Sequence, residues 1–190
     1  MLKTLRISII CIAIMLLIFV FLAAGCGYNF RADGEPLGIQ LDSIAIPLVT
    51  STSSEIGFEA DFTKIIRNEF INHTNLRLAY KERAQFILYG HIYEISTEPL
   101  SFDLRQETVN GYATIYEQTR TRRLKVKLDI SLIERASGKV IWHEPNMEEK
   151  ASFNVGGNDP LSTRHDKQRA LERIARQLAK RIFLRTTERF

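Results

Sequence analysis

Cysteine is scarce in this 190-residue sequence, which contains only Cys11 and Cys26. Cys11 lies in an apolar segment near the N-terminus, so a chain that loses this segment keeps one cysteine and forms no internal disulfide. Such a chain depends on its hydrophobic core, and about 165 residues are enough for one domain. We therefore expect a single folded unit without disulfide bonds.

Histidine is also rare, and no two of the four histidines have a metal-binding spacing. The sequence contains no His-Glu-x-x-His, no Cys-x-x-Cys, no Walker loop and no nucleophile elbow. Carboxylates are numerous, but their spacing marks no pair for acid and base catalysis. We therefore expect no metal, no cofactor and no enzymatic activity. The histidines are His73, His91, His143 and His165.

The first 25 residues have the organisation of an export signal. Lys3 and Arg6 precede an apolar run at 7–22, and the small residues 23–25 lead directly into Cys26. This order is typical of a lipoprotein signal peptide, in which the cysteine thiol is acylated. Because each buried methylene contributes about 0.8 kcal/mol, several acyl chains would hold the domain on a membrane. We predict cleavage before Cys26 and lipid attachment to it.

An uncleaved transmembrane anchor is the alternative, since residues 7–25 approach the roughly 20 apolar residues that span a bilayer. Ala23 also occupies a position where leucine is commonest in lipoprotein signals. Gly27 follows the cysteine, in place of the aspartate that retains enterobacterial lipoproteins in the inner membrane. We therefore expect the periplasmic face of the outer membrane. Losing Lys3 and Arg6 lowers the formal net charge from +4 by two, to +2, so nucleic acid is not an expected partner.

The remaining chain divides into a tether at 26–40 and one domain at 41–190. Residues 43–46 predict a short strand that Pro47 ends. Thr52 and Glu55 have capping-box spacing, which predicts that a helix begins there. This helix is expected to end at 73–75, and its apolar face consists of Phe58, Phe62, Ile65, Ile66 and Phe70.

From Ala84 the hydrophobic period changes to two, which predicts strands at 86–93 and 121–133. A turn at 136–138 leads to a strand that starts at 140–142 and is expected to resume after Pro145. The chain then ends in a long helix. Its apolar stripe contains Ala170, Leu171, Ile174, Ala175, Leu178, Ala179, Ile182 and Phe183.

The order strand, helix, three strands, helix predicts an α+β fold, with two helices packed on a roughly four-stranded, mostly antiparallel mixed sheet. Two basic clusters remain open to interpretation. The row opposite the last apolar stripe is either a solvated face or a surface against another protein. The cluster at 120–123 suits cross-strand pairing with Glu107 and Glu117. The row contains Arg169, Arg173, Arg176 and Lys180, and the cluster contains Arg120, Arg122 and Arg123.

Four short motifs follow one another along the chain: Cys26-Gly27-Tyr28-Asn29-Phe30-Arg31, Ser43-Ile44-Ala45-Ile46-Pro47, Ala84 through Leu88 to Gly90-His91-Ile92, and Gly138-Lys139-Val140-Ile141-Trp142. In this order they resemble the lipopolysaccharide-assembly lipoproteins of the LptE family. Gln85 departs from the aspartate that many members have at that place. A long hairpin and a closing Ala/Leu/Ile helix complete the similarity, which spans nearly the whole mature chain.

The resemblance implies a lipoprotein that plugs the outer-membrane β-barrel LptD, helps to assemble this barrel and delivers lipopolysaccharide to the cell surface. It implies no cofactor. The alternative is another periplasmic lipoprotein of similar layout, which regulates cell-wall synthases or forms part of a secretion pore. A module that binds a soluble ligand is a third class, and it would require a closed apolar pocket.

The resemblance also suggests where lipopolysaccharide binds, since cationic loop residues of family members are implicated in that contact. Guanidinium groups suit phosphate oxygens in geometry and charge. We expect Arg105 in a loop before the strand at 121–133, and Arg164 and Lys167 in the loop that enters the last helix. If both loops lie at one end of the sheet, these three cations grip the phosphates of lipid A from two sides.

Overall fold

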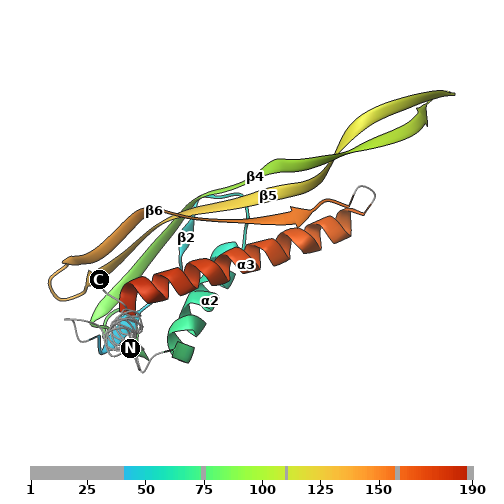
Figure 1. The fold of residues 1–190 in the computed structure, drawn as a ribbon. Helices are drawn as coiled ribbons and strands as arrows, with labels where there is room; N and C mark the ends of the chain where they lie inside the picture. Colours follow the sequence, from blue (N-terminus) through green and yellow to red (C-terminus); the bar gives the residue numbers. More distant parts are fainter. Residues whose placement is uncertain (1–40, 74–75, 110, 157–158, 188–190) are drawn as a thin grey trace, which may run out of the picture. The chain divides into compact units, whose positions relative to one another are not determined.

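The computed structural model describes residues 41–73, 76–109, 111–156 and 159–187. The expected signal segment, Cys26 and the tether lie outside these ranges. Two helices cover one face of a six-stranded sheet (Figure 1). The strands are β1 (Ser43–Ala45), β2 (Thr50–Ser51), β3 (Arg77–Leu78), β4 (Phe86–Val109), β5 (Tyr112–Glu134) and β6 (Val140–Asn154), and the helices are α2 (Phe58–His73) and α3 (Pro160–Thr187).

The sheet is mixed, in the order β3-β1-β4-β5-β6, and β2 pairs with β4. The short strands β1, β2 and β3 make parallel pairs, whereas β4, β5 and β6 form an antiparallel meander. This arrangement confirms the expected α+β class with two helices on a mostly antiparallel mixed sheet. The strands beyond the expected four are β2 and β3, which have two residues each and are too short to show a hydrophobic period.

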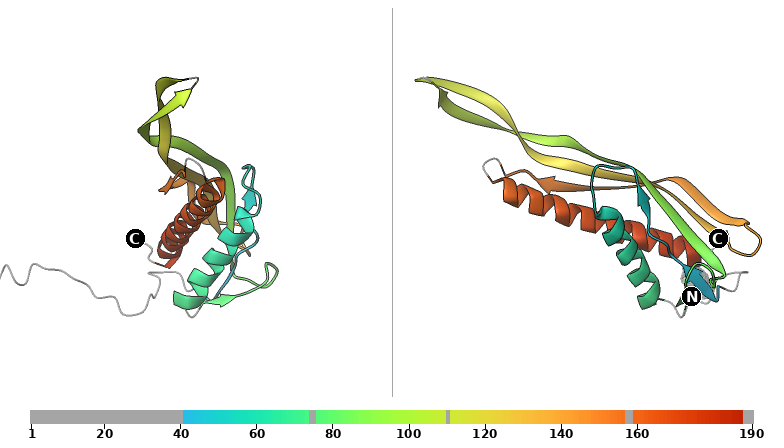
Figure 2. Two further views of the ribbon diagram at one scale, coloured as in Figure 1. Left: turned by 90° about the vertical axis from the view of Figure 1, so that its right-hand side faces the viewer. Right: turned by 180° about the vertical axis from the view of Figure 1, so that it is seen from behind.

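The hairpin of β4 and β5 is much longer than the sequence suggests. Its pairing runs from Phe86 opposite Glu134 to Val109 opposite Tyr112. Arg105 therefore lies within β4, opposite Tyr116, and the expected loop around it is wrong. The reason is that β6 pairs with β5 only from Thr121 onward, so none of the described strands lies beside the outer part of the hairpin, which projects past α3 (Figures 1 and 2).

Helix α3 begins earlier than expected because two residues define its start. The Asp159 carboxylate accepts hydrogen bonds from the backbone N–H groups of Leu161 (3.0 Å) and Ser162 (3.1 Å), as an N-cap does. Pro160 occupies the first helical position, where its missing N–H costs nothing. Arg164 and Lys167 therefore lie in the first turns of α3, and their expected placement in a loop is wrong.

Helix α2 begins later than the capping-box pattern predicts. Residues Thr50–Ser51 form β2, and the Thr52 N–H continues this pairing by donating to the Ile92 carbonyl at 3.0 Å. The backbone around Thr52 is thus extended and cannot start a helix. Gly57 has a φ of 94°, a conformation that glycine adopts readily, and α2 follows at Phe58.

One hydrophobic cluster joins the covered face of the sheet to both helices. The pleat places alternate residues of β5 on this face, as the alternation at 121–133 predicts. None of the helices in the described part of the chain is long and apolar enough to cross a membrane. Fully buried members of the cluster include Phe62, Ile66 and Phe70 of α2, Leu124, Leu128 and Ile130 of β5, and Ile174, Leu178 and Ile182 of α3.

Candidate functional site

The outer part of the β4–β5 hairpin, residues 102–109 and 112–119, is called here the distal hairpin. One of its faces carries apolar side chains in water. Phe102 lies opposite Thr119, Leu104 opposite Glu117, and Gln106 opposite Ile115, so these side chains share a face. The side chains of Phe102, Leu104 and Ile115 are 53%, 74% and 66% exposed. A two-stranded ribbon with such a face is marginal alone and gains stability when a partner covers it.

The other face of the distal hairpin is polar and contains Arg105. The Tyr116 hydroxyl hydrogen-bonds to Glu107, and this bond raises the pKa of Tyr116. Arg105 acts on the same hydroxyl in the opposite direction, because its positive charge favours the phenolate. At the base of the distal hairpin, Arg120 and Asp103 form an ion pair at 3.4 Å. This face therefore offers alternating charges, with Arg105 as one member of a cluster.

Arg164 and Lys167 line a groove of about 910 Å³ between α2 and α3. Apolar side chains form part of its wall, among them Phe58 and Leu171. The ammonium group of Lys167 is paired with the Glu55 carboxylate, 112 residues away in sequence. An anion that enters this groove meets Arg164 and competes with Glu55 for Lys167.

The structure brings two of the three expected cations together. Arg105 lies on the distal hairpin and lines neither this groove nor the second one described below. The start of α3 does lie at the end of the sheet from which the hairpin projects, because Asn154, shortly before α3, pairs with Thr121 (Figure 1). The hairpin and the start of α3 therefore lie toward the same end of the sheet, as expected, but Arg105 belongs to a separate surface.

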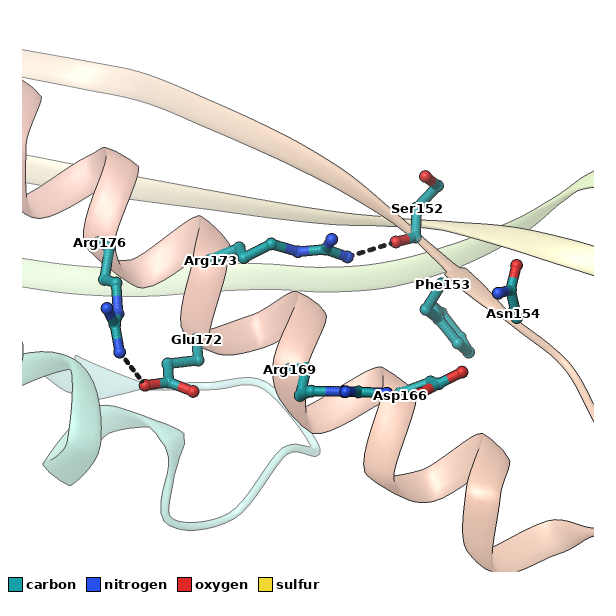
Figure 3. Close-up of a pocket in the computed structure, with 8 residues that line it drawn as sticks. All are labelled: Ser152, Phe153, Asn154, Asp166, Arg169, Glu172, Arg173 and Arg176. Carbon is teal, nitrogen blue, oxygen red and sulfur yellow. Dashed lines mark hydrogen bonds and ion pairs between the residues drawn. The ribbon is translucent and has the colours of Figure 1, made fainter.

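A second groove, of about 500 Å³, lies between β6 and α3 and is rich in arginine. Figure 3 shows that its arginines point to partners: Arg176 to Glu172 (2.5 Å), and Arg173 to the backbone carbonyl of Ser152 (2.7 Å). Arg169 forms an ion pair with Asp166 at 2.5 Å. All four residues of the arginine row on α3 are exposed, so the row is a solvated face, and each of its three guanidinium groups also has an acceptor.

Sequence reasoning missed the apolar face of the distal hairpin. Its signal was an alternation of apolar and polar residues over 100–105, in which Leu100, Phe102 and Leu104 are the apolar members. The basic cluster at 120–123 forms cross-strand ion pairs, as expected, but with different partners. Arg123 lies 3.3 Å from Glu98, and Arg120 pairs with Asp103, because the register of the hairpin places these acids nearer than Glu107 or Glu117.

Within the described ranges, no group of three or more histidine, cysteine or acidic side chains is arranged to hold a metal ion. What the fold presents is a two-layer α+β module with a projecting hairpin and shallow charged grooves. The model of the LptE family, described as lipopolysaccharide-assembly, matches residues 41–186. The chain belongs to this family. Membership confirms the expected class, an assembly lipoprotein and not an enzyme, and associates the chain with lipopolysaccharide assembly at the outer membrane.

Solved structures of bacterial lipoproteins are similar to this chain at low identity. Lipoprotein B from Nitrosomonas europaea has 10% identity and a TM-score of 0.49, over 85% of this chain and 90% of that one. The rare lipoprotein B from Shewanella oneidensis has 12% identity and a TM-score of 0.43, over 77% and 94%. A minor lipoprotein from Acinetobacter baumannii has 9% identity and a TM-score of 0.43, over 79% and 93%. Comparison with curated proteins found no match.

Proposed function

We propose that this protein is anchored in the outer membrane by lipid on Cys26, plugs the β-barrel LptD, helps to assemble this barrel and delivers lipopolysaccharide to the cell surface. Family membership supports the role in lipopolysaccharide assembly. The distal hairpin supports the role as a plug. Its exposed apolar face and two open strand edges are features that a surrounding barrel wall would cover.

The distal hairpin suits insertion for a mechanical reason as well. It continues two strands of the main sheet without a break in pairing other than local register shifts near Ile92 and Pro99. The helix pair packs on the base of these strands, so the packed layer holds the direction of the projecting ribbon. A barrel that receives the ribbon meets apolar groups on one face and charged groups on the other.

Lipopolysaccharide phosphates are proposed to bind at Arg164 and Lys167 in the groove between α2 and α3, and at Arg105 on the polar face of the distal hairpin. A charge-assisted hydrogen bond contributes about 1.5–3 kcal/mol, whereas an exposed ion pair contributes about 0–1 kcal/mol. The Lys167–Glu55 ion pair is only partly buried, with both side chains 30% exposed, so a phosphate can compete with Glu55 for Lys167.

Depletion of the protein tests this function. We expect the outer-membrane barrier to weaken, LptD to become scarce or misfolded, and surface lipopolysaccharide to fall. A triple change of Phe102, Leu104 and Ile115 to Ser should reproduce the loss of LptD while the domain stays folded, because these side chains contribute little to its own core. Normal LptD and normal surface lipopolysaccharide after depletion would instead favour a regulator of cell-wall synthesis or a secretion-pore component.

A further inference from the structure

The outer edge of β6 is the long edge of the part of the sheet that the helices cover, since the opposite edge there is the two-residue strand β3. In an antiparallel ladder, alternate residues direct their N–H and C=O groups toward the neighbouring strand, and the others direct theirs away. The Val155 N–H donates to the Arg120 carbonyl of the β5 chain at 2.8 Å. Odd-numbered residues at this end of β6 therefore face β5, and the even-numbered residues from Glu148 to Asn154 face outward.

Two arginines of α3 occupy outward-facing carbonyls of β6. Arg173 donates to the Ser152 carbonyl and Arg181 donates to the Glu148 carbonyl, each at 2.7 Å. The spacings match, because eight residues of helix rise about 12 Å and four residues of strand rise about 13 Å. Helix α3 runs antiparallel to β6. Arg173, the earlier arginine in the helix, therefore reaches the later carbonyl, that of Ser152, and Arg181 reaches the earlier one, that of Glu148.

An outward-facing N–H between these carbonyls is also occupied. The Lys150 N–H donates to Oε1 of Glu149 at 3.1 Å, and Oε2 of the same carboxylate lies 3.4 Å from Nη1 of Arg181. Arg181 thus caps one carbonyl directly and holds the carboxylate that caps the next N–H. Open edges are sites where strands of another chain add, and side chains that occupy the edge prevent this.

We propose that the outer edge of β6 is a self-pairing surface, able to pair with the same edge of a second copy, and that Arg173 and Arg181 hold it closed. The pairable stretch begins after Pro145, which has no N–H and lies at a register shift in the β5–β6 ladder. By preventing pairing between copies, Arg173 and Arg181 keep single copies available for insertion into a partner.

Charge complementarity identifies a second copy as the occupant. In a symmetric antiparallel pair centred on Glu149, outward-facing residues meet outward-facing residues, and Glu148 of each copy lies opposite Lys150 of the other. This register gives two ion pairs between the copies against one contact between the two Glu149 side chains. Within one chain these two side chains already form an ion pair at 2.7 Å. A pair centred on Lys150 would place two lysines opposite each other and is disfavoured, because Glu148 would then lie opposite Ser152 and no ion pair between the copies would offset the repulsion.

Co-capture of two differently tagged full-length chains, expressed together and extracted in detergent, tests the proposal. Changing Arg173 and Arg181 to Ala should raise the co-captured fraction by about tenfold, because two freed carbonyls in each copy gain hydrogen bonds to the other. The matched control changes Arg169 and Arg176 to Ala, which removes the same charge from the same helix but frees only acidic side chains. The co-captured fraction of this control variant should equal that of the wild type.

Two additions to the Arg173/Arg181 double variant separate edge pairing from general association. Lys150→Pro removes an outward N–H and should return co-capture to the wild-type value. Glu149→Cys should give a disulfide between the two copies, as the symmetric register requires. If the alanine variant fails to fold, Arg173→Lys with Arg181→Lys keeps the charge, loses the planar fork and should still raise co-capture. Equal co-capture by the edge and control variants, or a rise that Lys150→Pro does not reverse, overturns the proposal.

Discussion

Glu94 of β4 lies directly opposite Lys127 of β5 and forms an ion pair with it at 3.0 Å, on the face of the sheet that the helices leave uncovered. Lys125 approaches the other oxygen of the same carboxylate at 2.9 Å. Hydrogen bonds from Lys125 and Lys127 lower the pKa of Glu94 from its ordinary 4.5 to about 2. This carboxylate therefore joins two cations along one strand.

The lowered pKa of Glu94 predicts a specific acid sensitivity. A carboxyl group with a lower pKa in the folded chain stabilises the fold above its unfolded pKa, and this stabilisation is lost as the pH falls through the folded pKa. Urea unfolding should therefore show wild type more stable than Glu94→Gln above about pH 5, with the difference shrinking between pH 4.5 and 2. Glu98→Gln, which removes a single 3.3 Å pair with Arg123, should show a smaller difference. A pH-independent difference for Glu94→Gln would contradict the assignment.

Two leucines on the same hairpin should differ sharply in their effect on stability. Leu128 is fully buried beneath the helices, whereas Leu104 on the distal hairpin is 74% exposed. Leu128→Ala should lower the free energy of unfolding by about 2–5 kcal/mol, because it removes buried surface and leaves a cavity. Leu104→Ala should change it by no more than about 0.5 kcal/mol. Denaturant titration of the full-length chain measures both, and a large loss from Leu104→Ala would mean that the distal hairpin belongs to the core.

Lipid attachment to Cys26 predicts different outcomes for the two cysteines. Cys26→Ser should accumulate as an unprocessed precursor without lipid label, since the acylated thiol is absent. Cys11→Ser should be processed and labelled normally, because Cys11 lies within the segment that is removed. Metabolic labelling with a fatty acid and the mobility of the chain on gels measure both properties. Mature-sized, labelled Cys26→Ser protein would refute the assignment.

The proposed phosphate contacts predict a loss of lipopolysaccharide binding without a loss of fold. Arg164→Glu with Lys167→Glu raises the number of acidic side chains that line the groove between α2 and α3 from four, including Glu55, to six, and should weaken binding by about tenfold or more. Arg105→Glu should weaken it less, since it alters one contact on a separate surface. The control is Arg83→Glu with Lys139→Glu, which makes the same change in charge at exposed positions outside the groove. Equal lipopolysaccharide binding by the two double variants would show that the groove between α2 and α3 is not part of the binding site.

The parts of the fold that could be predicted from the sequence are those with one buried face. The strand at 121–133 alternates because Leu124, Leu128 and their neighbours face the helices while lysines face water. The distal hairpin has water on both faces, so only the short stretch from Leu100 to Arg105 alternates between apolar and polar residues, and Arg105 was assigned to a loop. The cation pair Arg164 and Lys167 could be placed near one another from their helical spacing, but the partner Glu55 could not, because 112 residues separate it from Lys167.

The contacts of the arginine row on α3 could not be predicted from the sequence either. Its helical spacing was visible in the sequence, and it suggested a solvated face. The hydrogen bond from Arg173 of this row to the Ser152 carbonyl of β6 depends on how helix and strand lie side by side, which no local pattern contains. Arg181, which caps Glu148, was not singled out at all.

Site-specific photocrosslinking in cells tests the central claim, that the distal hairpin contacts the wall of LptD. A photoreactive residue at Leu104 or Ile115 should give a covalent adduct with LptD, because both side chains lie on the exposed apolar face. The control is Val140, which is 52% exposed at the opposite end of the hairpin strands and should give little adduct. The account predicts LptD adducts from Leu104 and Ile115 well above those from Val140. Absence of LptD adducts at both distal positions, in cells where the protein and LptD are present at normal levels, would contradict it.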